Sequence, residues 1–207
     1  QTKYTRFKHV TYDEFSVSHK LDYYEKATGV RGIPHYRIDK AKVIVSFGAD
    51  FLNGWTGQNI DSDYAKSRKP GPDMSRHIQI ETNMSLTGSN ADRRIKAKPS
   101  EMGSALAYLF NKVSNASVTI PVANLRADLK MAMDDTAAEL LEGKNKGNSV
   151  VFVGGNDAHL ENIAFAINFA LGNISNTVAL GDTVFMRQGN DTDVVNLLAE
   201  MKAGKVG

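Results

Sequence analysis

Two short apolar runs constrain the fold of this chain more than any other feature of its sequence. The first covers residues 41–47 and ends in Gly48-Ala49-Asp50, and the second covers residues 149–153 and ends in Gly154-Gly155-Asn156. A continuous apolar run of this length that ends in turn residues is typical of a strand buried on both faces, as in a parallel sheet. The chain is therefore expected to contain a parallel sheet.

Helical patterns alternate with these strands. Helices are predicted over 16–28, 61–67, 102–113, 122–142, 158–171 and 194–202. Apolar residues recur at helical spacing over 102–113 and 122–142, and Ser100 is a plausible cap of the 102–113 helix. Residues 77–81 alternate in polarity like a further strand. Strands that alternate with helices indicate an α/β fold of parallel-sheet layers with flanking helices.

The same pattern predicts three parts of the chain. Residues 1–40 form an N-terminal connecting segment, 41–120 a first α/β half and 121–207 a second α/β half. The chain ends on a helix and a turn where a series of strands and helices would next place a strand, so we expect the second half to be truncated. Such a piece would expose apolar surface, and we expect it to self-associate.

Composition excludes several classes of function. The 25 basic and 23 acidic residues give a net charge of +2 without a basic stripe, so no nucleic-acid partner is expected. There is no cysteine, which excludes iron–sulfur ligation, thiolate zinc sites and thiol nucleophiles within these residues. No apolar run approaches the ~20 residues of a membrane helix, so direct membrane insertion is not expected. The histidines lack metal-ligand spacing, and no metal site is predicted.

The loops after the two apolar strands form the candidate ligand site. Ligands bind at the carboxyl edge of a parallel sheet, where glycine lets backbone N–H groups approach phosphates. The candidate residues are Gly48, Asp50, Gly155 and Asn156. Neither loop has the spacing of a dinucleotide or phosphate-binding motif, so ordinary tight turns are the alternative.

Glu81 is a further candidate because it ends the 77–81 strand, where a carboxylate could accept hydrogen bonds from ribose hydroxyls. An exposed glutamate at a strand end is the alternative, and we favour it. Trp55 is as consistent with an exposed loop contact as with core packing. No grouping of nucleophile and base can be argued from the sequence, so no catalytic residue is assigned.

Several segments resemble the molybdopterin oxidoreductases of the dimethyl sulfoxide reductase family. DKAKVIVSFGADFL (39–52) resembles the strand and loop that open their second domain, RHIQIETNMSLTGSNAD (76–92) the following strand, and IKAKPSEMGSAL (95–106) the next loop and helix. TYDEFSVS (11–18), VVFVGGN (150–156) and ALGN (170–173) are similar to segments of the molybdopterin-like iron–sulfur subunit of bacterial alternative complex III, a quinol:cytochrome c oxidoreductase. The resemblance spans nearly the whole chain.

This resemblance implies the cofactor contacts. In relatives that carry the molybdenum cofactor, its nucleotide part is contacted by the first loop, the acidic end of the second strand and a Pro-Gly-Thr-Asp-like turn. The matching positions here are Gly48 to Asp50, Glu81, and Pro99 to Glu101. Ser100 stands where the family has glycine, and the Thr-Asp pair is not reproduced, so the resemblance implies a vestigial site.

The resemblance also implies the function. The expected role is a non-catalytic scaffold domain of a respiratory, quinol-oxidising iron–sulfur subunit, inactive by itself, whose parent is an oxidoreductase with its iron–sulfur clusters elsewhere. Its partners would be the remaining domains of the parent chain, which would continue beyond residue 207 with an apolar strand, and the other subunits of a periplasmic, membrane-associated electron-transport complex. The alternative is the guanine-dinucleotide-binding part of an active molybdenum oxidoreductase. An unrelated nucleotide-binding α/β protein is a third and weaker interpretation.

Overall fold

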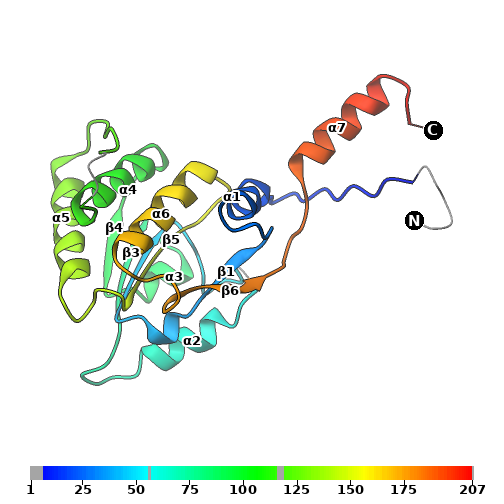
Figure 1. Ribbon diagram of the computed structural model, residues 1–207. Helices are drawn as coiled ribbons and strands as arrows, with labels where there is room; N and C mark the ends of the chain where they lie inside the picture. Colours follow the sequence, from blue (N-terminus) through cyan, green and yellow to red (C-terminus); the bar gives the residue numbers. More distant parts are fainter. Residues whose placement is uncertain (1–6, 56, 116–118, 207) are drawn as a thin grey trace.

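The structure is a computed structural model that describes residues 7–55, 57–115 and 119–206 (Figure 1). It consists of a body, in which helices cover a sheet, and of an arm that projects from one side of the body. We define the arm as residues 7–17 together with residues 185–206, which include helix α7 (Asp191–Lys202).

The main sheet confirms the predicted α/β fold. It contains β2 (Val43–Phe47), β3 (Arg76–Glu81), β4 (Arg93–Lys96) and β5 (Ser149–Val153). All neighbouring strands are parallel, and their order is β4-β3-β2-β5. Strands from both predicted halves of the chain therefore lie in one sheet, with the two apolar runs side by side.

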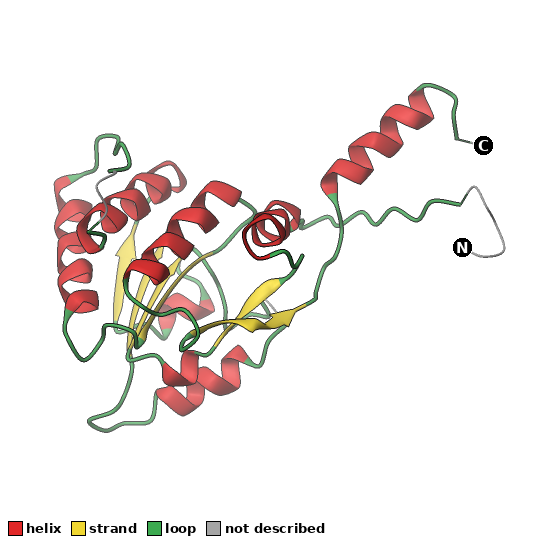
Figure 2. Cartoon of the chain, in the orientation of Figure 1, coloured by secondary structure: helices red, strands yellow, loops and turns green. Residues whose placement is uncertain are grey.

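Helices and a small second sheet cover the two faces of the main sheet (Figure 2). The helices of one face are α4 (Pro99–Val113), α5 (Ala127–Leu141) and α6 (Ala158–Ala170). The elements of the other face are α1 (Ser18–Thr28), the 3₁₀ turn η1 (Ile38–Lys40), α2 (Ile60–Ser67), and the antiparallel pair β1 (Ile33–Tyr36) and β6 (Val178–Val184). The short helix α3 (Leu86–Ser89) follows β3.

Each face of the sheet has its own hydrophobic core, which explains why β2 and β5 are apolar throughout. Val43, Val45 and Phe47 pack with side chains of α4, α5 and α6. Ile44 and Phe152 point to the opposite core, which includes Leu21, Tyr36 and Phe51. Every residue of β2 and β5 is buried. Period-2 alternation is lost because both sides of the strand are covered.

Side chains occupy the outer edge of β5. The N–H of Val151 donates to Oδ1 of Asn168 at 3.0 Å, and Nδ2 of Asn168 donates back to the carbonyl of Val151 at 2.5 Å. The N–H of Ser149 donates to Oδ1 of Asn173, and Oγ1 of Thr177 donates to the carbonyl of Ser149. A further strand would have to displace these side chains before it could pair with β5.

The starts of three predicted helices differ from the structure by three residues or more. Ser100 does not cap α4: the cap is Lys98, whose N–H donates to Oε2 of Glu101 at 2.8 Å, and Ser100 is an exposed residue of the first turn. The helix predicted from residue 122 begins at Ala127, after a non-helical segment that contains Pro121, and α7 begins at Asp191, before the predicted start at residue 194.

Three strands were not predicted from the sequence. β4 is an edge strand with the sequence RRIK, whose charges hide any apolar pattern and are typical of sheet edges. β1 contains Pro34, and β6 contains Gly181, and both residues are typical of turns. These strands are stabilised by pairing and packing in the tertiary structure, because their own residues have only a weak preference for strands.

Candidate functional site

The carboxyl edge of the sheet brings the two glycine loops together. The chain goes from β2 to β3 on one side and later adds β5 on the other side, so β2 and β5 flank the point where the strand order reverses. Ligands of open α/β sheets bind at this point. The N–H of Gly154 donates to the carbonyl of Phe47 at 2.8 Å, and a Cβ on Gly154 would collide with the carbonyl of Gly48. Glycine here lets the two loops approach each other.

A cavity of about 500 Å³ lies beside these loops. Its lining comes from the loop after β2, the loop after β5 and the base of the arm: Phe15, Ser16, Val17, Asp50, Asn53, Gly54, Trp55, Gly155 and Arg187. Of the predicted site residues, Asp50 and Gly155 line this cavity. Gly48 adjoins it in the loop after β2, with φ +69°.

Asp50 is engaged by α3. Its Oδ1 accepts hydrogen bonds from the N–H of Thr87 at 3.0 Å and from Oγ1 of Thr87 at 2.7 Å. Burial alone would raise the pKa of Asp50, but the hydrogen bonds from Thr87 outweigh it and hold the pKa below its usual value. The carboxylate is therefore ionised and tied to the start of α3.

Asn156 caps α1 from across the fold. Its Oδ1 accepts hydrogen bonds from the N–H groups of His19 at 2.8 Å and Lys20 at 3.3 Å. The residue before the helix, Val17, has no side chain that can cap it. Asn156 thus supplies the missing cap, and it is not among the residues that line the cavity.

Glu81 is buried, so the exposed glutamate that we favoured from the sequence was wrong. Its Oε1 lies 2.5 Å from Nε of Arg94, and its Oε2 accepts a hydrogen bond from Oγ of Ser85 at 2.6 Å. Burial alone would raise the pKa of Glu81, but the hydrogen bonds from Ser85 and Arg94 outweigh it and lower the pKa. A side chain at Gly88 would collide with this carboxylate.

Glu81 ends a row of buried polar side chains on one face of β3. Nε2 of Gln79 donates to Oε2 of Glu81 and to the carbonyl of Ala49, both at 3.2 Å, so Oε1 of Gln79 faces Nε2 of His77 at 3.3 Å. His77 must then carry its proton on Nε2, and its Nδ1 lies 3.0 Å from the hydroxyl of Tyr64, whose one proton is shared between Nδ1 and the carbonyl of Asn90. Burial lowers the pKa of His77 to about 4, which keeps the imidazole neutral.

Ser100 lies apart from the other candidates. α4 follows β4, which β3 separates from β2, so Ser100 is on the carboxyl side of the sheet but not next to the glycine loops. It does not line the cavity. Of the six candidate positions, the structure therefore brings Gly48, Asp50 and Gly155 together at this cavity and leaves Ser100 apart from it.

A buried charged cluster beside the cavity was not predicted from the sequence. Nζ of Lys20 lies 2.5 Å from Oε1 of Glu161, and both side chains are 1% exposed. The same ammonium donates to the carbonyl of Val153 at 2.8 Å and lies 4.6 Å from the ring centroid of Trp55. Lys20 thus fastens α1 to β5 and α6.

Two tyrosines complete this cluster. The hydroxyl of Tyr24 donates to Oε2 of Glu161 at 3.1 Å, and so the hydroxyl of Tyr36, 3.0 Å away, donates to Tyr24. Burial raises the pKa of Glu161, although the ammonium of Lys20 opposes it, and burial also raises the pKa of both tyrosines. Oε1 of Glu161 has no hydrogen bond of good geometry among the described residues, and the ion pair with Lys20 is its polar contact.

The sequence contained one signal of this cluster. Glu161 is the single acidic residue of the apolar helix AHLENIAFAINFA, where a lone carboxylate needs a partner. Both roles considered for Trp55 from the sequence are present: its ring stacks on Tyr36 and Phe152 in the core, and the residue also lines the cavity beside the loops.

The chain matches no family model, and no curated protein matches it. In the part of the chain that the structure describes, no group of three or more His, Asp or Glu side chains is placed to hold a metal ion. No helix among the described residues has the length and apolar character needed to cross a membrane. Fold and site define an α/β protein with a cavity where the strand order reverses, in which internal hydrogen bonds engage most of the predicted ligand groups.

Proposed function

We propose that this chain is a non-catalytic scaffold domain of a larger redox protein of the molybdopterin oxidoreductase type, in the branch of alternative complex III. One observation carries the proposal. The polar side chains that would contact a cofactor nucleotide, Asp50, Glu81 and Asn156, already serve α3, β4 and α1 through internal hydrogen bonds.

These side chains do not fit the role of nucleotide ligands. To accept a hydrogen bond from a ribose or a base, Asn156 would have to release the first turn of α1. Loss of a helix cap costs about 1 kcal/mol. Glu81 is enclosed by Arg94 and Ser85, with Gly88 packed against its carboxylate, so a ligand has no access to it.

Two further observations support a scaffold role. The chain has no cysteine, so it cannot ligate an iron–sulfur cluster, and electron transfer would belong to neighbouring parts of the assembly. An apolar groove lies between α4 and α6, lined by Phe110, Phe165 and the exposed Phe169. Exposed apolar grooves of this kind are typical of contact surfaces. We propose the remaining domains of the parent and the subunits of a periplasmic respiratory complex as its neighbours.

Metal analysis of the complete protein that contains this chain tests the proposal. We expect iron from clusters held by other domains and less than about 0.1 molybdenum per protein. Stoichiometric molybdenum would overturn the scaffold role and support the alternative, the guanine-dinucleotide-binding part of a molybdenum oxidoreductase. That alternative is favoured by one observation: Arg187 and Gly155 line the cavity at the strand reversal, and guanidinium groups and open backbone N–H groups are typical phosphate ligands.

A further inference from the structure

Helix α7 is only lightly packed within the described part of the chain, where Lys8 forms an ion pair with Glu200 at 3.9 Å. All 12 of its residues are described, and none of them is buried. Figure 1 shows the helix projecting away from the body. Isolated helices of this length are marginal in water, because most helical stability in proteins comes from packing of an apolar face. α7 therefore presents a surface that another molecule can cover.

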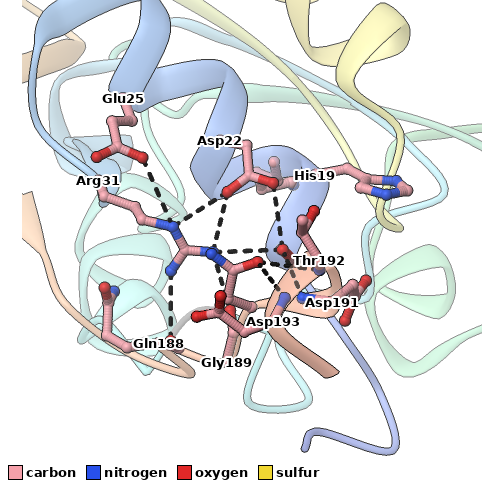
Figure 3. Close-up of polar contacts among 12 residues, drawn as sticks. His19, Asp22, Glu25, Arg31, Gln188, Gly189, Asp191, Thr192 and Asp193 are labelled. Atoms are coloured by element: carbon pink, nitrogen blue, oxygen red, sulfur yellow. Dashed lines mark hydrogen bonds and ion pairs between the residues drawn. The ribbon is translucent and has the colours of Figure 1, made fainter. Parts of the chain in front are cut away.

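The base of α7 is nevertheless fixed to the body (Figure 3). Arg31 pairs with Asp22 of α1 at 3.0 Å and donates to the carbonyl of Gly189 at 2.9 Å. Asp191, the first residue of α7, accepts a hydrogen bond from Ser16 at 2.8 Å, and its N–H donates to Ser18. These bonds join the two segments of the arm to α1 and set the direction of α7.

The exposed face of α7 carries three apolar residues that are evenly spaced about Leu198. Val195, Leu198 and Met201 follow each other at intervals of three residues, and their exposed fractions lie between 56% and 64%. Leu198 is the centre of this stripe, with one residue three positions before it and one three positions after it. A second copy of the helix, turned to run in the opposite direction, places the same stripe against it, so that Val195 meets Met201 of the second copy.

The charges of α7 favour this antiparallel arrangement. Asp191 and Asp193 lie at the start of the helix, and Lys202 and Lys205 lie at and beyond its end. In an antiparallel pair each acidic end faces the basic end of the other copy, whereas a parallel pair would bring like charges together. The mixture of charges also differs from the basic face that a membrane-surface helix presents.

Aromatic residues near the base of the arm enlarge the surface. Tyr12, Phe15 and Phe185 are between 66% and 74% exposed. At ~200 Å² for each aromatic side chain they contribute about 400 Å². With about 300 Å² from the stripe of α7, each copy offers roughly 700 Å², close to the ≈ 800 Å² per partner of a standard interface. α7 alone would be too small, so a standard interface requires these aromatic residues to take part in the contact.

We propose that the arm is a homodimerisation element, in which two copies of this chain pair through antiparallel α7 helices about a two-fold axis near Leu198. A symmetric pair buries the same patch of both copies, which is the commonest arrangement of oligomers. This inference goes beyond the scaffold function and does not rest on it.

Sedimentation of the 207-residue chain over a range from about 1 to 300 μM tests the proposal. We expect a concentration-dependent dimer, and we expect Leu198→Glu to raise the dimer dissociation constant more than ~10-fold, since it buries a charge at the centre of the contact. Met131→Glu is the matched control, because Met131 is a similarly exposed apolar residue of α5, in the body. A monomer at all concentrations, or an equal effect of both variants, would overturn the proposal.

A cross-link tests the two-fold geometry directly. The chain has no cysteine, so Leu198→Cys introduces a single thiol. A mild oxidant removes two electrons and two protons from two such thiols, and a disulfide forms only where the Cα atoms lie within ~7 Å. We expect rapid covalent dimers for Leu198→Cys and slow ones for the control Met131→Cys. Equal cross-linking rates of the two variants would contradict a two-fold axis near Leu198. A dimer formed through another face would give this result.

Discussion

The substitution Lys20→Met tests the role of the buried charged cluster. Lys20 joins α1 to Glu161 of α6 and to the carbonyl of Val153 at the end of β5. Methionine has a similar length and can fill the same space, so the change removes the charge with little change in volume. What remains is a carboxylate that is 1% exposed and keeps a single hydrogen bond, from Tyr24.

The magnitude follows from this burial. Removal of one partner of a buried ion pair costs about 3–5 kcal/mol, because the other charge stays buried without compensation. The whole free energy of unfolding of a domain is about 5–15 kcal/mol, so the variant should lose a large fraction of its stability. Replacement of both partners, in Lys20→Met/Glu161→Leu, should recover most of the loss, since well-packed apolar residues often replace a buried pair at little cost.

The pH dependence gives an independent check. Burial raises the pKa of Glu161, and the loss of Lys20 removes the charge that opposes this rise. A carboxyl whose folded pKa lies above its unfolded value binds more protons in the folded state, so stability falls as the pH increases from the unfolded pKa to the folded pKa. Lys20→Met should therefore be less destabilised at pH 5 than at pH 8.

Urea unfolding followed by circular dichroism measures these changes. Lys26→Met is the matched control, since Lys26 is an exposed lysine of the same helix, and it should change the free energy of unfolding by less than about 0.5 kcal/mol. If Lys20→Met were as mild as Lys26→Met, or if the double variant were no more stable than the single one, the cluster would not hold α1 in the way described.

Three further predictions concern single side chains. Asn156→Ala removes the cap of α1 and should cost about 1 kcal/mol, with faster hydrogen exchange in the first turn of that helix; unchanged exchange there would refute the capping role. Because burial lowers the pKa of His77 to about 4, the folded state binds fewer protons than the unfolded state below pH 6.5. Stability should then be lost as the pH falls from 6.5 to 4, by about 3 kcal/mol in full; an NMR titration that showed His77 protonated at pH 6 would contradict this. Asn168→Leu leaves Val151 at the edge of β5 unpaired and should cost about 1–3 kcal/mol and promote aggregation, measured by thermal unfolding and light scattering; an equally stable, non-aggregating variant would show that the edge needs no side-chain partner.

The layers of the fold could be predicted from the sequence, because the continuous apolar runs of β2 and β5 indicate strands that are buried on both faces. β3 was recognised as a strand, but its alternation of polar and apolar residues favours one solvated face. In the structure α2 and α3 cover that face, and the polar residues His77, Gln79 and Glu81 satisfy one another. Only the tertiary fold determines whether the polar face of such a strand is exposed to solvent or covered by helices.

The candidate site was predicted in part. The sequence placed Gly48, Asp50 and Gly155 correctly at the carboxyl edge, because the ends of parallel strands share one edge. It could not show that Asn156 caps a helix more than a hundred residues earlier, or that Lys20 pairs with Glu161. Such pairs join distant segments, and neither residue has a local pattern that names its partner. Ser100 was misplaced because Pro99 starts the helix one position earlier.

Titration calorimetry with a guanine nucleotide is the most direct test of the claim that the predicted ligand groups serve the fold. Molybdopterin guanine dinucleotide, and guanosine monophosphate as its nucleotide half, would be titrated into the folded 207-residue chain, with circular dichroism to confirm the fold. The account predicts no saturable heat at ligand concentrations up to about 1 mM, which corresponds to binding weaker than about −4 kcal/mol. Saturable binding that Arg187→Ala weakens would contradict it, since Arg187 lines the cavity at the strand reversal.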